Sequence, residues 1–250
     1  MKLCGYEKKR YARHISLPQI GMRGQIRLKN SSVAVIGAGG LGSSALLYLA
    51  AAGIGRIKVI DSEKVDVSNF QRQVIYSEWM RGRPKAGYVV ERIGELNRRV
   101  RTESFFGKLD KDNADALLRG YDVILDCLDN FTGRDIVNSF CVKTGTPLVH
   151  GSVYRFEGHL SVFCMKGGPC YRCLYPYLPK SDVPAGAGIM GALPGVIGSM
   201  QALETVKILT GSGKVFSGRV LTYDSLEGSF DIFDLKNRSD CGVCGRRSGK

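Results

Sequence analysis

Long apolar runs are missing from this 250-residue sequence. Its most apolar stretch, AGIMGALPGVIGSM, is shorter than the roughly 20 residues that a membrane-spanning helix needs and is broken by Gly and Pro. The first residues, MKLCGYEKKRYARH, contain no apolar core of the kind found in secretory signals. The sequence therefore excludes a membrane span and predicts a cytoplasmic protein.

Histidine is also scarce, because the chain has only three, His14, His150 and His159. None of them stands in a recognisable catalytic setting, so each is expected to be structural or exposed. Internal repeats and low-complexity tails are absent as well, which favours one continuous domain over residues 1–250.

Charge and cysteine are abundant by contrast. The formal net charge is +13, from 36 Lys and Arg against 23 Asp and Glu. This excess favours anionic partners, although the basic residues are scattered and a merely solvated surface stays open. Four of the eight cysteines form two CxxC pairs, Cys170/Cys173 and Cys241/Cys244. In a chain without a secretory signal such pairs favour a metal site over disulfides.

The hydrophobic pattern predicts an α/β fold. Short β-branched strands alternate with helices of about ten residues, which indicates a mostly parallel sheet with helices on both faces. After residue 150 the pattern changes to strands separated by turns, which predicts antiparallel pairing, with a helix over about Pro194–Leu209. The expected strands of the first half are Val33–Ile36, Ile57–Ile60, about Arg101–Phe106, a strand from Asp122, and PLVHG; those of the second half are GHLSVFCM, RVLTYDS and SFDIFDL.

The stretch VAVIGAGGLGSS contains the pattern Gly37-x-Gly39-x-x-Gly42 between a predicted strand and a predicted helix. In this setting the first glycine allows a tight turn, the second lets the backbone approach a phosphate, and the third lets the helix pack on the sheet. Asp61 follows Gly42 by 19 residues, at the end of the next strand, where an acid can hold ribose hydroxyls. Together they predict a nucleotide site.

The residues that follow Asp61 in the sequence distinguish a dinucleotide site from a triphosphate site. Asn69, Arg72 and Lys85 supply more positive and polar groups than a dinucleotide's diphosphate needs, and they suit a triphosphate whose pyrophosphate departs. An NAD-dependent dehydrogenase is therefore only a remote alternative.

Asp126 and Asp129 add acid at the carboxyl end of a predicted parallel strand, where open α/β sheets bind ligands. A carboxylate beside a triphosphate is a natural Mg²⁺ ligand. The competing interpretation is that Asp129 or Asn130 only caps a helix.

The two CxxC pairs lie 67 residues apart and offer four thiolates, the ligand set of a closed structural zinc site. The fold would have to bring the C-terminal tail back to Cys170. A redox CxxC is the main competitor.

Taken together, these elements resemble the E1-like adenylyltransferases of the MoeB/ThiF/HesA family, from about Tyr11 to Cys244. The motifs that carry the resemblance are RYARHISL, GAGGLGSS, VIDSEKVDVSNFQRQ, GRPK, DCLDN, PCYRCL and CGVCG. The resemblance implies a Rossmann-like sheet extended by C-terminal antiparallel strands and a zinc-bound tail. It divides the domain into a nucleotide-binding half, about residues 31–150, and a carrier-binding half, about residues 151–250, with a crossover loop and the zinc site.

The resemblance also implies an activity: a homodimer uses ATP, with Mg²⁺, to adenylate the C-terminal glycine of a small ubiquitin-like (β-grasp) sulfur carrier that ends in Gly-Gly. Arg13 would reach into the partner subunit's ATP site. The catalytic positions would be Arg72, Lys85, Asp129 and Arg13. The nucleotide contacts would be Gly37, Gly39, Gly40, Gly42, Asp61, Ser68, Asn69, Arg72, Lys85, Asp129 (with Mg²⁺) and Asn130. The zinc (Zn²⁺) ligands would be Cys170, Cys173, Cys241 and Cys244.

The sequence departs from the family at one place. Many relatives have a cysteine in the crossover loop, whereas PKSDVPAGAGIM has none and Pro184 stands near the aligned position. This favours adenylation without a loop-cysteine thioester, with sulfur delivered by a separate sulfurtransferase. Cys127 is expected to be buried packing.

Two alternatives to the carrier reaction stay open besides the dehydrogenase. One is an ATP-dependent tRNA-modifying, dehydratase-type member of the same superfamily, which the basic surface fits equally well. The other is a zinc-dependent nucleic-acid-binding module, which leaves Arg72, Lys85 and Asp129 without a role. A nucleic-acid partner is therefore not expected.

Overall fold

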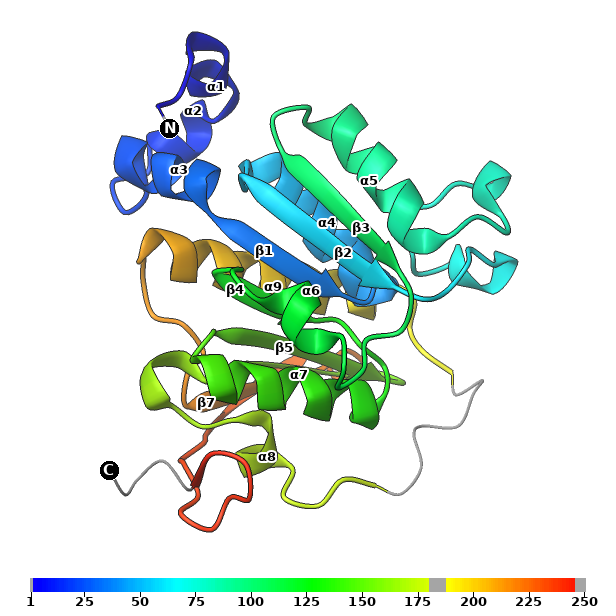
Figure 1. The fold of residues 1–250 in the computed structure, drawn as a ribbon, viewed down its shortest axis with the longest axis vertical. Helices are drawn as coiled ribbons and strands as arrows, with labels where there is room; N and C mark the ends of the chain where they lie inside the picture. The colour runs from blue at the N-terminus through cyan, green and yellow to red at the C-terminus, as the bar shows by residue number, and fades with distance from the viewer. Residues whose placement is uncertain (1, 180–187, 246–250) are drawn as a thin grey trace.

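A computed structural model of the chain describes residues 2–179 and 188–245. One eight-stranded sheet runs through the molecule in the order β3-β2-β1-β4-β5-β6-β7-β8 (Figure 1). The strands from β1 to β5 pair in parallel, and those from β5 to β8 pair antiparallel. The predicted α/β fold with a parallel half and an antiparallel extension is confirmed.

The parallel half contains β1 (Ser32–Ile36), β2 (Arg56–Asp61), β3 (Arg101–Phe106), β4 (Val123–Asp126) and β5 (Leu148–Tyr154). The central strand β1 is rich in β-branched residues because it is covered on both faces. Val33 and Val35 pack into one core, whereas Ala34 and Ile36 pack into the other.

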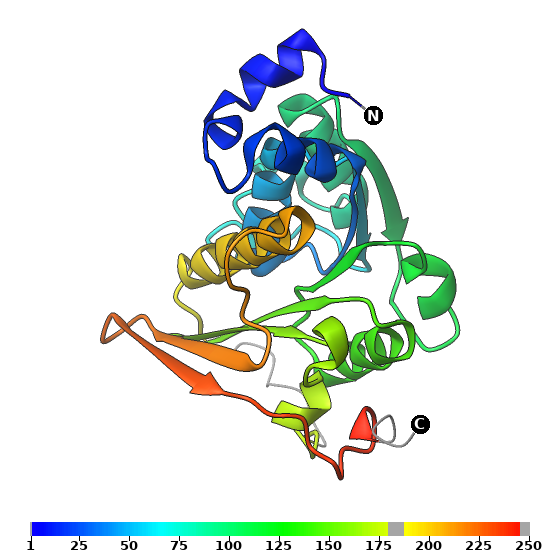
Figure 2. The same cartoon turned by 90° about the vertical axis from the view of Figure 1, so that its left-hand side faces the viewer.

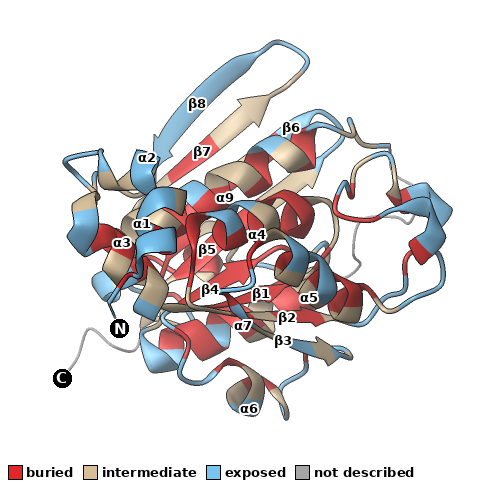
Figure 3. Ribbon diagram, turned by 90° about the horizontal axis from the view of Figure 1, so that it is seen from above, coloured by how far each residue is buried: buried red, intermediate tan, exposed pale blue. Residues whose placement is uncertain are grey.

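Helices form a layer on each face of the sheet. One core contains side chains of α4 (Gly40–Ala52), α5 (Lys85–Leu96) and α9 (Leu193–Thr210). The other contains side chains of α6 (Ala114–Leu118), α7 (Phe131–Thr144) and α8 (Tyr171–Leu174). Figure 3 shows the buried strands between these helices. The two layers leave the carboxyl ends of the parallel strands open at one edge.

The antiparallel half contains β6 (Glu157–Phe163), β7 (Arg219–Asp224) and β8 (Ser229–Asp234). Figure 2 shows β7 and β8 projecting as a hairpin, after which the chain returns to lie beside α8. Every residue of β8 is exposed because this strand forms the edge of the sheet. The predicted strand PLVHG is longer than expected, since β5 continues to Tyr154 by pairing with β6.

Before the sheet come α1 (Gly5–Arg10), α2 (Ala12–Ile15) and α3 (Gly21–Asn30). They are anchored by Glu7, which is buried and accepts hydrogen bonds from Lys29 Nζ at 2.7 Å and the Cys4 backbone at 2.8 Å. Burial tends to raise the pKa of Glu7, but these hydrogen bonds outweigh it and lower the pKa to about 2.

We expect Glu7→Gln to destabilise the protein at neutral pH and to have less effect in acid. The folded pKa of Glu7 lies below its ordinary value of 4.5, so its stabilisation is present above pH 4.5 and is lost as the pH falls toward 2. Urea unfolding of both proteins between pH 7 and pH 3 measures this difference. An equal loss of unfolding free energy at both ends of that range would contradict the assignment.

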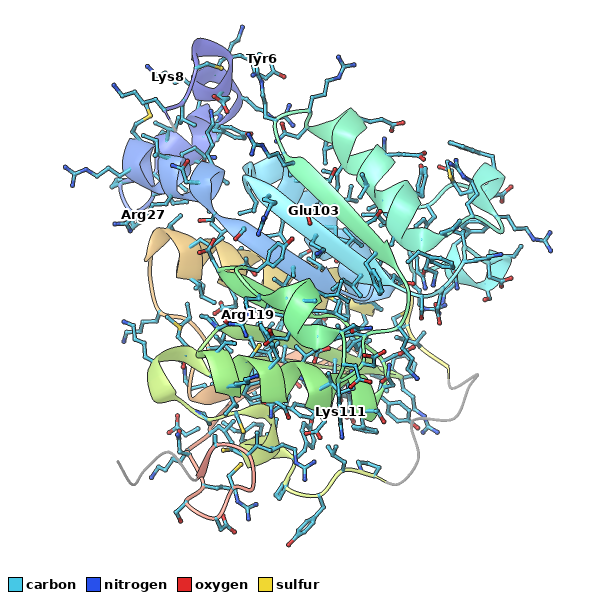
Figure 4. All side chains as sticks on the ribbon, viewed as in Figure 1. Tyr6, Lys8, Arg27, Glu103, Lys111 and Arg119 are labelled. Atoms are coloured by element: carbon cyan, nitrogen blue, oxygen red, sulfur yellow. The ribbon has the colours of Figure 1, made fainter. Side chains whose placement is uncertain are left out.

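Positive charge is spread over the surface of the described residues. The exposed side chains of Lys8 and Arg27, labelled in Figure 4, come from the N-terminal helices α1 and α3, whereas those of Lys111 and Arg119 lie before and after α6, in another part of the fold. Arg119 is paired with Asp115. Within the part of the chain that is described, no helix has both the length and the apolar character needed to cross a membrane.

Candidate active site and cysteine cluster

A cavity of about 990 Å³ opens where β1, β2 and β4 end. The predicted nucleotide contacts line it except for Gly42 and Lys85, and Arg13 also lies elsewhere. The chain thus brings together residues that lie more than 90 positions apart in the sequence. Open α/β sheets bind ligands at this edge.

The glycine loop forms one wall of the cavity. Gly37 has a φ of 94°, and a Cβ there would lie 2.5 Å from the carbonyl oxygen of Cys127. A Cβ on Gly42 would lie 2.1 Å from the carbonyl oxygen of Gly37, so a side chain at either position would force the loop apart. Gly39 is different because a Cβ there would meet nothing closer than 3.7 Å. Its backbone therefore leaves open space at the amino end of α4, where a phosphate can bind.

Asp61 holds the loop from the end of β2. Its two carboxylate oxygens accept hydrogen bonds from the Ala38 and Glu63 backbones, each at 2.7 Å. Burial raises the pKa of Asp61 above its ordinary value, against the effect of these hydrogen bonds and of nearby Lys85. The carboxyl group is therefore fixed at the floor of the cavity.

The segment after β2 carries the polar residues opposite the glycine loop. The side chain of Asn69 accepts a hydrogen bond from the Asp66 backbone at 2.9 Å, and Arg72 donates to the carbonyl of Ser68 at 2.9 Å. These local bonds fix the turn that presents Ser68, Asn69 and Arg72 to the cavity.

Lys85 lies behind this wall. Its side chain is 1% exposed, and its ammonium group pairs with Glu63 Oε2 at 2.5 Å. Glu63 itself lines the cavity. The positive charge of Lys85 therefore lies behind Glu63. Direct contact between Lys85 and a ligand in the cavity would require Glu63 to move aside.

The two aspartates at the end of β4 lie in different environments. Asp126 is 1% exposed and pairs with His150, whereas Asp129 is exposed and lines the cavity. Asn130 caps α7 by accepting a hydrogen bond from the Gly133 backbone at 2.8 Å, so α7 begins at Phe131. The capping role belongs to Asn130, and Asp129 offers a carboxylate that suits Mg²⁺.

Beneath Asp129 lies a buried polar group of residues that the sequence did not single out as a unit. Arg134 donates to the carbonyl of Leu128 at 2.6 Å, and His150 Nδ1 lies 2.7 Å from Asp126 Oδ2. Burial lowers the pKa of His150, against the effect of Asp126, so the neutral ring donates from Nδ1. Arg134 also lines the cavity, and its place five residues after Asp129 on a helix is the only sequence signal for it.

The remaining histidines and Cys127 do not form a catalytic set. His14 Nδ1 lies 3.1 Å from Gln25, and His159 lines the cavity, where burial lowers its pKa. Cys127 is buried and bonds Gln201, and burial raises the pKa of its thiol far above the ordinary value. The expectation that Cys127 is buried packing is confirmed, because a thiol in this state is a poor nucleophile.

The cavity continues beyond the nucleotide residues along the β5–β6 hairpin. Its walls there include Tyr154, Glu157 and His159, with Tyr175 and Ile189 from segments on either side of the crossover loop. The position near Pro184, where relatives have a cysteine, lies outside the described residues. This part of the cavity is continuous with the part lined by the glycine loop.

The four paired cysteines meet at the far side of α7. The sulfur of Cys170 lies 3.9 Å from that of Cys173 and 3.7 Å from that of Cys241, and Cys173 lies 3.3 Å from Cys244. All four sulfurs lie within 4.8 Å of one another. Thiolates around a tetrahedral zinc, with bonds of about 2.3 Å, stand about 3.8 Å apart. The cluster therefore fits a closed zinc site.

Comparison with known proteins agrees with this geometry. Residues 11–243 match the model of the ThiF family. The chain is 46% identical to a sulfur carrier protein adenylyltransferase of Thermus thermophilus, over 98% of this chain and 93% of that protein. It is 44% identical to the mouse adenylyltransferase and sulfurtransferase MOCS3, over 95% of this chain but only 53% of that protein, so it spans about half of this relative. The crystal structure of E. coli MccB with MccA-N7isoASN shares the fold, with a TM-score of 0.85 and 20% identity over 95% of this chain and 74% of that one.

Proposed function

The chain belongs to the ThiF family, and from that premise we propose that it catalyses the ATP-dependent adenylation of the C-terminal glycine of a small ubiquitin-like sulfur carrier. The observation that carries the proposal is that one cavity joins the glycine loop, Arg72 and Asp129 to a further part along the β5–β6 hairpin. The Thermus relative, which this chain matches along nearly its full length, is named for such a reaction.

The reaction would need little proton chemistry. The carrier's terminal carboxylate is already ionised, and its oxygen attacks the α-phosphorus of ATP while the bond to the pyrophosphate oxygen breaks. The products are an acyl-adenylate and pyrophosphate. Alignment and charge neutralisation are then the main requirements, and they fit a site whose histidines are neutral or outside the cavity.

Each part of the cavity has a task in this proposal. Backbone groups of Gly39 and Gly40 hold phosphate, and the carboxylate of Asp61 holds the ribose. Arg72, with Lys85 behind it, offsets the charge of the departing pyrophosphate. Asp129 would hold Mg²⁺ beside Asn130, and the metal would supply Lewis-acid neutralisation of the phosphate oxygens.

The carrier's Gly-Gly tail would lie along the β5–β6 hairpin. Positive surface charge would favour encounter with an acidic carrier. The described residues from about 151 onward would form the carrier-binding half, and sulfur would come from a separate sulfurtransferase, without a thioester to the crossover loop.

We further propose a homodimer in the cytoplasm. Arg13 lies on α2 and does not line the cavity of its own chain, which supports action on the cavity of a second copy. The outer side of the α4–α9 pair carries Tyr48 and Leu203, which are 60% and 61% exposed. Apolar residues on the outer side of helices that are already packed on a sheet indicate an interface.

The carrier requirement is tested by ATP–pyrophosphate exchange. We expect exchange of labelled pyrophosphate into ATP only when a carrier ending in Gly-Gly is present, because the reversible step consumes its terminal carboxylate. The matched control is the same carrier lacking its last glycine, which should support no exchange. Exchange that requires tRNA and ignores every carrier would instead favour the tRNA-modifying alternative.

A further inference from the structure

A group of buried polar side chains lies between the cysteine cluster and the cavity. Among the described residues, seven buried side-chain nitrogen and oxygen atoms have no hydrogen-bond partner. Four of them belong to this one group: Arg134 Nε, Asn138 Nδ2, His150 Nε2 and the Tyr171 hydroxyl. Arg134 Nε nevertheless lies 3.8 Å from Asp126 Oδ2, so the charged members of this group pair with each other beneath the cavity.

The group touches the cysteine cluster through Tyr171, which follows Cys170 and precedes Cys173 by two residues. The Tyr171 backbone donates to Asn138 Oδ1 on α7 at 2.8 Å. Its ring packs against that of His150, with 5.2 Å between centroids. A displacement of α8 would therefore disturb contacts with both α7 and β5.

The group touches the cavity through Leu128, the residue before Asp129. The Leu128 backbone N–H donates to Asp126 Oδ1 at 3.0 Å, and its carbonyl accepts from Arg134 at 2.6 Å. Both backbone polar groups of Leu128 are thus held by buried side chains. Arg134 stands one helical turn before Asn138, on the same side of α7.

The contacts form one continuous series from the cysteines to Asp129. Cys170 is followed in the chain by Tyr171, which contacts Asn138 and His150. Asn138 lies one helical turn from Arg134, and His150 pairs with Asp126. The side chains of this group are almost entirely buried: Asp126, His150 and Tyr171 are 1% exposed and Asn138 is 0% exposed. Such packed groups shift between discrete arrangements more readily than they deform gradually.

We propose that zinc binding at the cysteine cluster and nucleotide binding in the cavity are energetically coupled through this group, with Arg134 as the residue that positions Leu128 and Asp129. The inference rests on the proposed function. Coupling of this kind is reciprocal: if bound zinc favours nucleotide binding, bound nucleotide must retain zinc by the same factor. The prediction can therefore be tested without measuring catalysis.

The test measures the zinc affinity of the full chain by equilibrium competition with a chelator, with and without a non-hydrolysable ATP analogue and Mg²⁺. We expect the analogue to raise the zinc affinity by about fivefold or more in the unchanged protein. In Asn138→Leu, which removes the acceptor for Tyr171, the two affinities should become nearly equal. If Asn138→Leu does not fold, Arg134→Lys repeats the test, because it keeps the charge but loses the forked donor.

Asn97→Leu is the matched control. Asn97 is also a buried asparagine, bonded to Tyr11 and to the Ala50 carbonyl, but it lies outside the group. This variant should lose stability yet keep the effect of the analogue on zinc affinity. If Asn97→Leu also abolished the effect of the analogue on zinc binding, the loss would reflect a general destabilisation of the fold. That result would overturn the proposal.

Direct titration of the analogue in the same samples separates the two proposals. Binding of the analogue with no change in zinc affinity overturns the coupling and leaves the proposed function standing. Failure of the analogue to bind at all overturns the proposed function and the coupling with it.

Discussion

Asp129→Ala should reduce carrier-dependent ATP–pyrophosphate exchange by about 10³-fold or more, while leaving the fold unchanged. The loss is large because the exposed carboxylate is the acid that the cavity offers to a metal on the phosphates, and losing one electrostatic contact to a transition state costs about 10²–10³-fold even without a metal. The fold should survive because this exposed side chain accepts a 3.3 Å hydrogen bond from neighbouring Asn130 and is not part of the core. Exchange kinetics with saturating carrier measure the effect, and thermal unfolding checks the fold.

Two controls sharpen this result. Asp112→Ala removes another exposed aspartate, on the loop before α6, which does not line the cavity, and should leave exchange unchanged. Asp126→Asn should instead lower stability, because it disturbs the buried contacts to His150 and Leu128. Normal turnover in Asp129→Ala would remove Asp129 from the site and with it the proposed metal position.

Cys244→Ser should lower both the zinc content and the stability of the chain. The purified protein is expected to hold about one zinc per chain, and the variant clearly less, because a serine hydroxyl replaces a thiolate in a four-sulfur site. Metal binding that occurs only in the folded state stabilises it. A loss of several kcal/mol corresponds to a fall in Tm of about 5–15 °C for a chain of this size. Metal analysis and scanning calorimetry give the two readouts.

Cys4→Ser serves as the control for this variant. Cys4 is exposed and stands at the amino end of α1, where serine is a favoured residue, so zinc content should stay the same and stability should not fall. A metal-free preparation of the unchanged protein that is as stable as the zinc-loaded one would refute the zinc assignment.

Much of the fold could be predicted because its signals are local. The β-branched run Val33–Ile36, the glycines after it and the helix that follows lie within about 20 residues, and each reflects the same strand–turn–helix geometry. The predicted bounds of most elements therefore agree with the structure to within a few residues. The extension of β5 beyond the predicted strand was missed, since it depends on pairing with β6.

The site could be predicted only in part. Sequence placed Asp126 and Asp129 together at one strand end, but their three-residue spacing does not say which carboxylate is covered. The structure separates them, because α7 and β5 bury Asp126 and leave Asp129 exposed. Lys85 was expected at the phosphates, whereas the fold places its ammonium group against Glu63.

The sequence alone determined the class of fold, the glycine loop and the two CxxC pairs, because each depends on residue types at short, regular spacings. Tertiary structure alone decided how these parts are connected. Arg134, Asn138, His150 and Tyr171 come from three elements, and nothing in their spacing predicts that they meet between the cysteine cluster and Asp129. Burial and hydrogen-bond pairing depend on which distant segments pack together, and that is settled only when the sheet and both helical layers have formed.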